Sequence, residues 1–212
     1  MPALPPARLP TEARQALIVA AAIALAGRNS PAAITTGDIA REVGVTQGAL
    51  FKHFATREAI WLAVMEWVTV QLLARLESAA AVQASGTEAA RSDMALDALA
   101  RVFAAHIDFV IQCPGVPRLI FHDLQQPADS PLKRQLGLLL QRYRQLLMRL
   151  LQSAVQQGEV QADLDIAAST TMFIGIVQGL AMQSILAGPG NDLSTEAARV
   201  LPLYLRSIRK AP

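Results

Sequence analysis

The most restrictive feature of this sequence is a row of apolar residues between positions 130 and 157 that repeats at helical spacing. Leu132, Leu136, Leu139, Tyr143 and Leu146 follow one another at intervals of four or three residues, which places them on one face of an α-helix. No segment shows the alternation of apolar and polar residues that is typical of a half-buried strand. The chain is 52% hydrophobic but only 5% aromatic, so helix-favouring Ala and Leu supply most of its core. The sequence therefore predicts an all-α protein.

Turn and capping residues divide the chain into about nine expected helices. Gly27 and Gly44 follow two of the apolar segments, and Pro114, Gly115 and Pro117 are expected to interrupt the chain between two later helices. The residues expected to cap helix N-termini are Thr11, Thr35, Thr46 and Thr56. The expected helices cover residues 11–26, 35–43, 46–54, 56 onward, 88–112, 117–125, 130–157, 165–187 and 194–209.

Residues 35–54 predict two short helices that meet across a tight turn at Gly44. Apolar residues of both helices can pack together, and the small Ala40 allows the second helix to cross closely. This is the arrangement of a helix-turn-helix, whose second helix enters the DNA major groove. The preceding helix, residues 11–26, covers the pair, so its apolar run is interpreted as core and not as a cleaved signal peptide.

The side chains of the second short helix suit a DNA surface. Gln47 can read base edges, while Gly48 and Ala49 keep the helix face low enough to approach the groove. The formal net charge of the chain is only +2, and the basic excess lies within residues 1–60. Residues 45–57 contain no acid, and their ionisable side chains are Lys52, His53 and Arg57. The same pattern also fits a helical hairpin whose polar tips have no function.

The segment from about Thr11 to Met65 resembles the DNA-binding domain of the tetracycline-repressor (TetR) family of bacterial transcription regulators. The resemblance covers about a quarter of the chain. The residues that carry it are Ala21-Ala22, Thr35-Thr36, Asp38-Ile39-Ala40, Gly44-Val45-Thr46, Gly48-Ala49-Leu50-Phe51, His53-Phe54 and Arg57-Glu58. It implies a three-helix DNA-binding domain over residues 1–56, followed by a helical effector-binding and dimerisation domain over residues 57–212.

The resemblance also implies roles for individual residues of the helix-turn-helix. Two departures from the family pattern stand out: Phe51 replaces the usual tyrosine, which removes a hydroxyl that binds phosphate, and Gly37 replaces a base-reading arginine of some members. Arg57 stands where the family usually has lysine and is expected to pair with phosphate. The expected DNA-binding residues are Thr35, Thr36, Thr46, Gln47, Gly48, Ala49, Phe51, Lys52, His53 and Arg57.

The segment 165–187 is apolar on nearly every face, which predicts burial on two sides. One side can meet the protein's own core and the other a second subunit; alternatively, the helix is entirely internal. Members of the family usually form homodimers through their last two helices, so the resemblance favours the dimer. The residues expected at this interface are Gly175, Gly179, Met182, Leu186, Leu201 and Tyr204.

The middle helices of family members usually enclose a pocket for a small molecule. His106 and His122 are the expected polar anchors of an otherwise apolar site, although each candidate residue also fits an ordinary core. The candidate pocket residues are Met65, Phe103, His106, Phe109, Phe121, His122, Tyr143 and Met172. No catalytic arrangement, metal site or cofactor motif is found in the sequence, so no enzyme activity and no cofactor are expected.

The expected function is a cytoplasmic, ligand-responsive repressor that binds double-stranded operator DNA as a homodimer and is released by a small apolar effector. No membrane span is expected, because polar residues interrupt the apolar run of residues 170–188. Two alternatives remain at this point. One is a helical small-molecule-binding protein that has weakened or lost DNA binding, and the other is an architectural DNA-binding protein without an effector.

Overall fold

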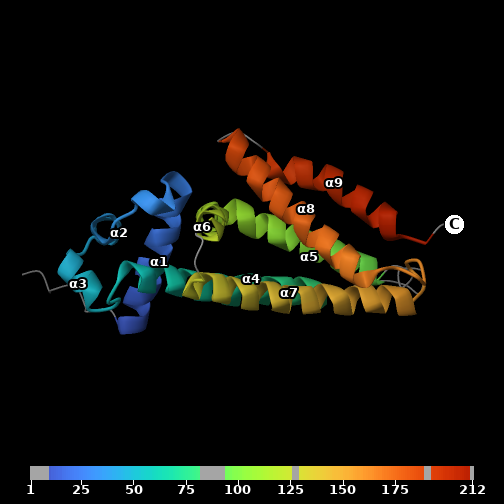
Figure 1. The fold of residues 1–212 in the computed structure, drawn as a ribbon, viewed down its shortest axis with the longest axis horizontal. Coiled ribbons are helices and arrows are strands. Elements are labelled where there is room, and N and C mark those ends of the chain that lie inside the picture. The colour runs from blue at the N-terminus through green and yellow to red at the C-terminus, as the bar shows by residue number, and fades with distance from the viewer. Residues whose placement is uncertain (1–9, 82–93, 126–128, 189–191, 211–212) are drawn as a thin grey trace, which may run out of the picture. The chain divides into compact units, whose positions relative to one another are not determined.

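The computed structural model describes residues 10–81, 94–125, 129–188 and 192–210, which contain nine α-helices and one short 3-10 helix (Figure 1). The predicted all-α fold is confirmed. Within these residues the β-pairing is limited to one isolated bridge, between Val160 and Arg209. The elements are α1 (Thr11–Arg28), η1 (Pro31–Ala33), α2 (Thr36–Val43), α3 (Gln47–Phe51), α4 (Arg57–Ala81), α5 (Met94–Gln112), α6 (Gly115–Leu124), α7 (Pro131–Gln156), α8 (Ile166–Ala187) and α9 (Leu193–Ile208).

Three local predictions are wrong. The third helix was expected to reach residue 54, but α3 ends at Phe51. Thr11 is the first residue of α1 and not its cap, because Pro10 takes the cap position without a side-chain bond. Helix α6 begins at Gly115 instead of 117 and includes Pro117 in its first turn. Proline fits there because the first backbone N–H groups of a helix have no partner within the helix. The expected start of the fifth helix at residue 88 lies outside the described residues.

The described chain forms two compact units. The head unit contains the residues up to Trp67 together with Pro114–Lys133, and the body unit contains Val68–Cys113 and the residues from Arg134 onward. This grouping differs from the predicted division at residues 56 and 57. The difference arises because α6, although distant in sequence, packs against α1 and η1 in the head unit.

Helices α1 and α6 of the head unit approach each other closely at Gly115. A Cβ atom placed on Gly115 would lie 2.1 Å from the carbonyl oxygen of Ile23 and 2.8 Å from the backbone nitrogen of Gly27. Two backbones can approach this closely only where no side chain intervenes. Gly115 was predicted to break a helix, whereas its structural role is to allow this helix crossing.

The core of the body unit contains a cluster of aromatic rings from four helices. The Phe173 ring on α8 meets the rings of Phe103 and Tyr204 edge to face, at centroid distances of 5.5 and 5.4 Å. Tyr143 of α7 lies 6.4 Å from the same ring. The Tyr204 hydroxyl donates to the carbonyl oxygen of Ser169 at 3.2 Å, which joins α9 to α8. Burial raises the pKa of the Tyr143 hydroxyl and of the Tyr204 hydroxyl.

A buried carboxylate connects three further parts of the body unit. Glu159, between α7 and α8, accepts hydrogen bonds from the backbone nitrogens of Ala95 (3.0 Å) and Leu96 (2.8 Å). These N–H groups belong to the first turn of α5 and have no partner within that helix. The Glu159 carbonyl oxygen accepts a bond from the backbone nitrogen of Lys210 at 3.2 Å. The start of α5, the link between α7 and α8 and the end of α9 are thereby held together.

Candidate nucleic-acid interface

The helix-turn-helix is formed by two capped helices and one left-handed glycine. Thr46 caps α3 by accepting a bond from the backbone nitrogen of Ala49 at 3.1 Å. Gly44 ends α2 at φ +74°, a conformation that residues with side chains rarely adopt. The backbone nitrogen of Val45 then donates to the carbonyl oxygen of Ala40 at 2.9 Å. The predicted caps at Thr35 and Thr46 are confirmed, and so is the predicted end of α2 at Gly44.

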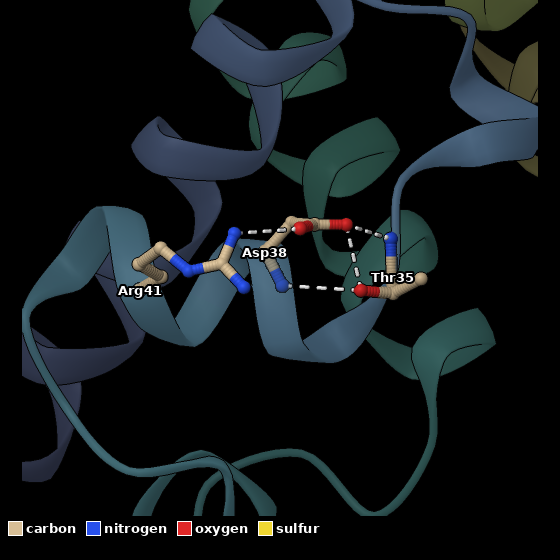
Figure 2. A network of polar contacts seen from close by, with 3 residues as sticks. All are labelled: Thr35, Asp38 and Arg41. Carbon is tan, nitrogen blue, oxygen red and sulfur yellow. Dashed lines mark hydrogen bonds and ion pairs between the residues drawn. The ribbon is translucent and has the colours of Figure 1, made fainter.

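The N-terminus of α2 is stabilised by a capping box, shown in Figure 2. The Thr35 side chain accepts a bond from the backbone nitrogen of Asp38 (3.1 Å), and the Asp38 carboxylate accepts from the backbone nitrogen of Thr35 (2.9 Å). Arg41 donates to the other carboxylate oxygen of Asp38 at 3.0 Å. Hydrogen bonds from Thr35, more than the ion pair with Arg41, lower the pKa of Asp38. Thr35, an expected DNA contact, therefore already has a structural role.

Helix α3 buries one residue and exposes the residues expected to face DNA. Leu50 is fully buried, whereas Gln47, Gly48 and Lys52 are exposed. Phe51 is 43% exposed, so the ring that replaces the family tyrosine lies at the surface. This short helix carries no acidic side chain and Lys52 follows directly at its end, which suits contact with the phosphates and bases of a major groove.

Two of the expected contacts bind each other in the absence of DNA. The side-chain nitrogen Nε2 of Gln47 donates to Oγ1 of Thr36 at 2.6 Å, which connects the starts of α3 and α2. This bond holds the Gln47 amide in one orientation. A base edge or a phosphate would have to replace it as the partner of either side chain.

The side chain of Arg57, which is expected to bind phosphate, is bonded to backbone carbonyl oxygens in this structure. Its guanidinium donates to the carbonyl oxygens of Pro31 and of Ala32, the latter at 3.2 Å, and so joins the start of α4 to η1. Its Nε atom is buried without a partner among the described residues. A contact between Arg57 and phosphate would compete with these bonds, and Arg57 has a clear structural role in the head unit.

The structure adds Arg14 to the candidate DNA-binding residues. A groove of about 520 Å³ in the head unit is lined by Arg14 of α1 together with Ala49, Lys52 and His53. Sequence reasoning missed Arg14, although it lies one helical turn before the buried Ile18 and so points toward the same neighbours. The Nδ1 atom of His53 is buried without a partner in the described part of the chain, which leaves Nε2 as the nitrogen that can donate outward.

The eight expected pocket residues are divided between the two units. Met65, Phe121 and His122 belong to the head unit, and the other five to the body unit. His106 bonds to the Tyr143 hydroxyl through Nδ1 at 3.1 Å, and burial lowers the pKa of His106 to about 4. Met172 is 42% exposed, so Phe173 and not Met172 contributes to the aromatic cluster.

The expected dimer residues differ in how far they are exposed to solvent. Met182 is 44% exposed and Leu186 is 80% exposed on α8, where Gly175 is exposed as well. Gly179 and Leu201 are partly buried. Tyr204 does not belong to an outer surface, because it is buried and bonded to Ser169. It was assigned to the interface because the sequence alone does not show which face of α9 meets α8.

A helix-turn-helix with an exposed, acid-free second helix that ends at Lys52, followed by a larger all-α body, defines a class of DNA-binding transcriptional regulators. Residues 18–64 match the description "Bacterial regulatory proteins, tetR family", and residues 126–199 match "Tetracyclin repressor-like, C-terminal domain". The chain belongs to the TetR family of transcriptional regulators, and its helix-turn-helix is the DNA-binding domain of that family.

Individual relatives are distant but cover most of the chain. The fatty acid metabolism regulator protein of Bacillus subtilis is 22% identical over 90% of this chain and 93% of its own. The nucleoid occlusion factor SlmA of a Marinomonas species is 24% identical over 71% of this chain and 73% of its own. The structure of the regulator FadR from Bacillus subtilis in complex with stearoyl-CoA superposes with a TM-score of 0.75 at 21% identity, covering 92% of this chain and 99% of that one.

Proposed function

We propose that this regulator is a cytoplasmic repressor that binds a palindromic operator as a homodimer and leaves it when a small apolar effector binds. The observation that carries the proposal is the capped helix α3 with its acid-free, exposed face. Release follows if the effector binds more tightly to a conformation that fits the operator poorly. The matching relatives include a fatty acid metabolism regulator and a structure with stearoyl-CoA, which favours an effector with a long apolar chain.

The proposed DNA contacts come from α1 and from the helix-turn-helix. Lys52, His53 and Arg14 would contact phosphates, while Gln47 and Ala49 would face bases and Gly48 would allow close approach. Thr36 and Thr46 would contact phosphate next to the helix caps. This division separates contacts that give affinity from contacts that give sequence preference.

Lys52→Ala tests the DNA-binding surface without knowledge of the operator. Each phosphate contact releases about one counterion, so the substitution should reduce the slope of log affinity against log salt by about one unit. The measurement is fluorescence anisotropy of a labelled random-sequence duplex at several salt concentrations. Lys210→Ala is the matched control, because it removes the same charge far along the chain. Absence of salt-sensitive DNA binding by the wild type would contradict the proposal.

The proposed dimer uses the outer face of α8 and α9. Met172, Met182 and Leu186 of α8 and Leu203 of α9 are large apolar residues left exposed in the protomer. Among the described residues, α8 and α4 are the two helices that are apolar and long enough to span a membrane by length and composition alone. A partner helix accounts for this apolar surface in a regulator. Sedimentation equilibrium at micromolar concentration should give twice the 22.7 kDa mass of the chain; a monomer would contradict this part of the proposal.

A further inference from the structure

The head unit contains a second hollow that the DNA-binding surface does not use. Its volume is about 410 Å³, which is within the usual range of small-molecule sites. Four segments form it: η1, the first turns of α4, helix α6 and the start of α7. All of its lining residues belong to the head unit.

The inner wall of this hollow is apolar and firmly packed. Trp61 and Leu119 line it while remaining 6% and 2% exposed, so their remaining surface is held by the core behind them. Leu62, Leu132 and Pro31 complete the apolar wall. Such a wall can bind the apolar body of a ligand without rearrangement.

The charges at the rim indicate the kind of polar group that would bind there. Arg57 is the one arginine of the lining, and its guanidinium already donates to the carbonyl oxygens of Pro31 and Ala32. Two carboxylates, Glu58 and Asp123, and one imidazole, His122, also line the hollow. A carboxylate can accept several hydrogen bonds, so the lining has more carboxylates than guanidinium groups to offer a ligand.

Asp123 is held in place by the loop before α7. The Ser130 hydroxyl donates to Oδ2 of Asp123 at 3.1 Å and accepts a bond from the backbone nitrogen of Lys133 at 3.0 Å. The carboxylate is therefore positioned while most of its accepting capacity remains available. Trp61 contributes an aromatic ring to the lining, and aromatic rings attract cations.

We infer that this hollow is a binding site for a small aryl or alkyl amine, whose apolar body lies on Trp61 and Leu119 and whose ammonium group is bound by Asp123 and Glu58. Its lining shares no residue with the aromatic cluster of the body unit. Because Arg57 joins its wall to η1, the segment directly before α2, a bound amine contacts the framework of the helix-turn-helix itself.

The test uses phenethylamine and two probes with the same aromatic body, hydrocinnamic acid and phenethyl alcohol. The full-length Trp67→Phe variant leaves Trp61 as the sole tryptophan, so its fluorescence reports occupancy, and isothermal titration calorimetry gives the affinity. Phenethylamine should bind saturably and more tightly than the alcohol, and the acid should not bind. No DNA is present, so the outcome is independent of the proposed repressor function.

Two substitutions locate the site, with a matched control. Asp123→Asn, which keeps the side-chain shape, should weaken phenethylamine binding about tenfold because a charge-assisted hydrogen bond is lost. Ala59→Leu fills the hollow without changing any charge and should weaken phenethylamine and the alcohol alike. Asp108→Asn, on α5 of the body unit, should leave binding unchanged. Failure of phenethylamine to bind, equal binding by Asp123→Asn, or preference for the acid would each overturn the inference.

Discussion

The helix-turn-helix of the head unit and the link between α7 and α8 in the body unit differ in how far apart in the sequence their stabilising polar partners lie. In the helix-turn-helix, Thr35 binds Asp38 and Thr46 binds Ala49, each across three residues. In the body unit, Glu159 binds the backbone of Ala95 across 64 residues. Contacts between residues that are close in the sequence can be recognised from short motifs. Contacts between residues that are far apart in the sequence depend on the whole fold.

The largest expected effect concerns a long-range contact of the head unit, the crossing of α1 and α6 at Gly115. Gly115→Ala should destabilise the protein by about 3 kcal/mol or more, because its Cβ would overlap the backbone of Ile23 and force α1 and α6 apart. Urea unfolding followed by tryptophan fluorescence measures the change.

Gly137→Ala is the control for this comparison. Gly137 is an exposed residue of α7 with open space around its added Cβ, so alanine should stabilise the helix by about 0.5–1 kcal/mol. Equal effects of the two substitutions would show that the α1–α6 crossing does not hold the head unit together.

The next effect concerns the body unit and depends on pH. Burial lowers the pKa of His106 from 6.5 to about 4, so below pH 6.5 the unfolded chain binds a proton that the folded chain does not. The free energy of unfolding is therefore unaffected by protonation of His106 above about pH 6.5. It falls by up to about 3 kcal/mol as the pH decreases from 6.5 toward 4.

The measurement is the free energy of unfolding between pH 7 and pH 4 for the wild type and for His106→Asn. The variant retains a polar side chain that does not titrate, so it should lose less stability over this range. Parallel pH dependence of the two proteins would mean that the carboxylates, and not His106, determine acid sensitivity.

The smallest expected effect returns to a local contact of the head unit. Thr35→Ala removes the side-chain cap of α2 and should cost about 1 kcal/mol. Thr11→Ala is the matched control, because Thr11 begins α1 without a side-chain capping bond, and it should change stability by less than about 0.5 kcal/mol. If both substitutions cost the same, the capping box does not stabilise α2 in the way its geometry indicates.

The same contrast explains what could be predicted from the sequence. The roles of Thr35, Gly44 and Thr46 can be recognised from the residues next to them in the sequence. The two caps and the end of α2 were therefore predicted correctly. Gly115 was misassigned, because a glycine that permits a helix crossing resembles one that breaks a helix. The bonds of Arg57 to the carbonyls of Pro31 and Ala32 were not predicted, because these partners lie far away in the sequence. The residues next to Glu159 in the sequence do not indicate its bonds to the start of α5, and these bonds were not predicted.

The bond between Glu159 and the far end of the chain also orders events during synthesis. The head unit contains no residue beyond Lys133, so it can fold while the rest of the chain is still on the ribosome. The body unit cannot form all its contacts until Lys210 has emerged to meet Glu159. The bonds that form the helix-turn-helix therefore need only residues made early in synthesis, whereas those of Glu159 need residues made last.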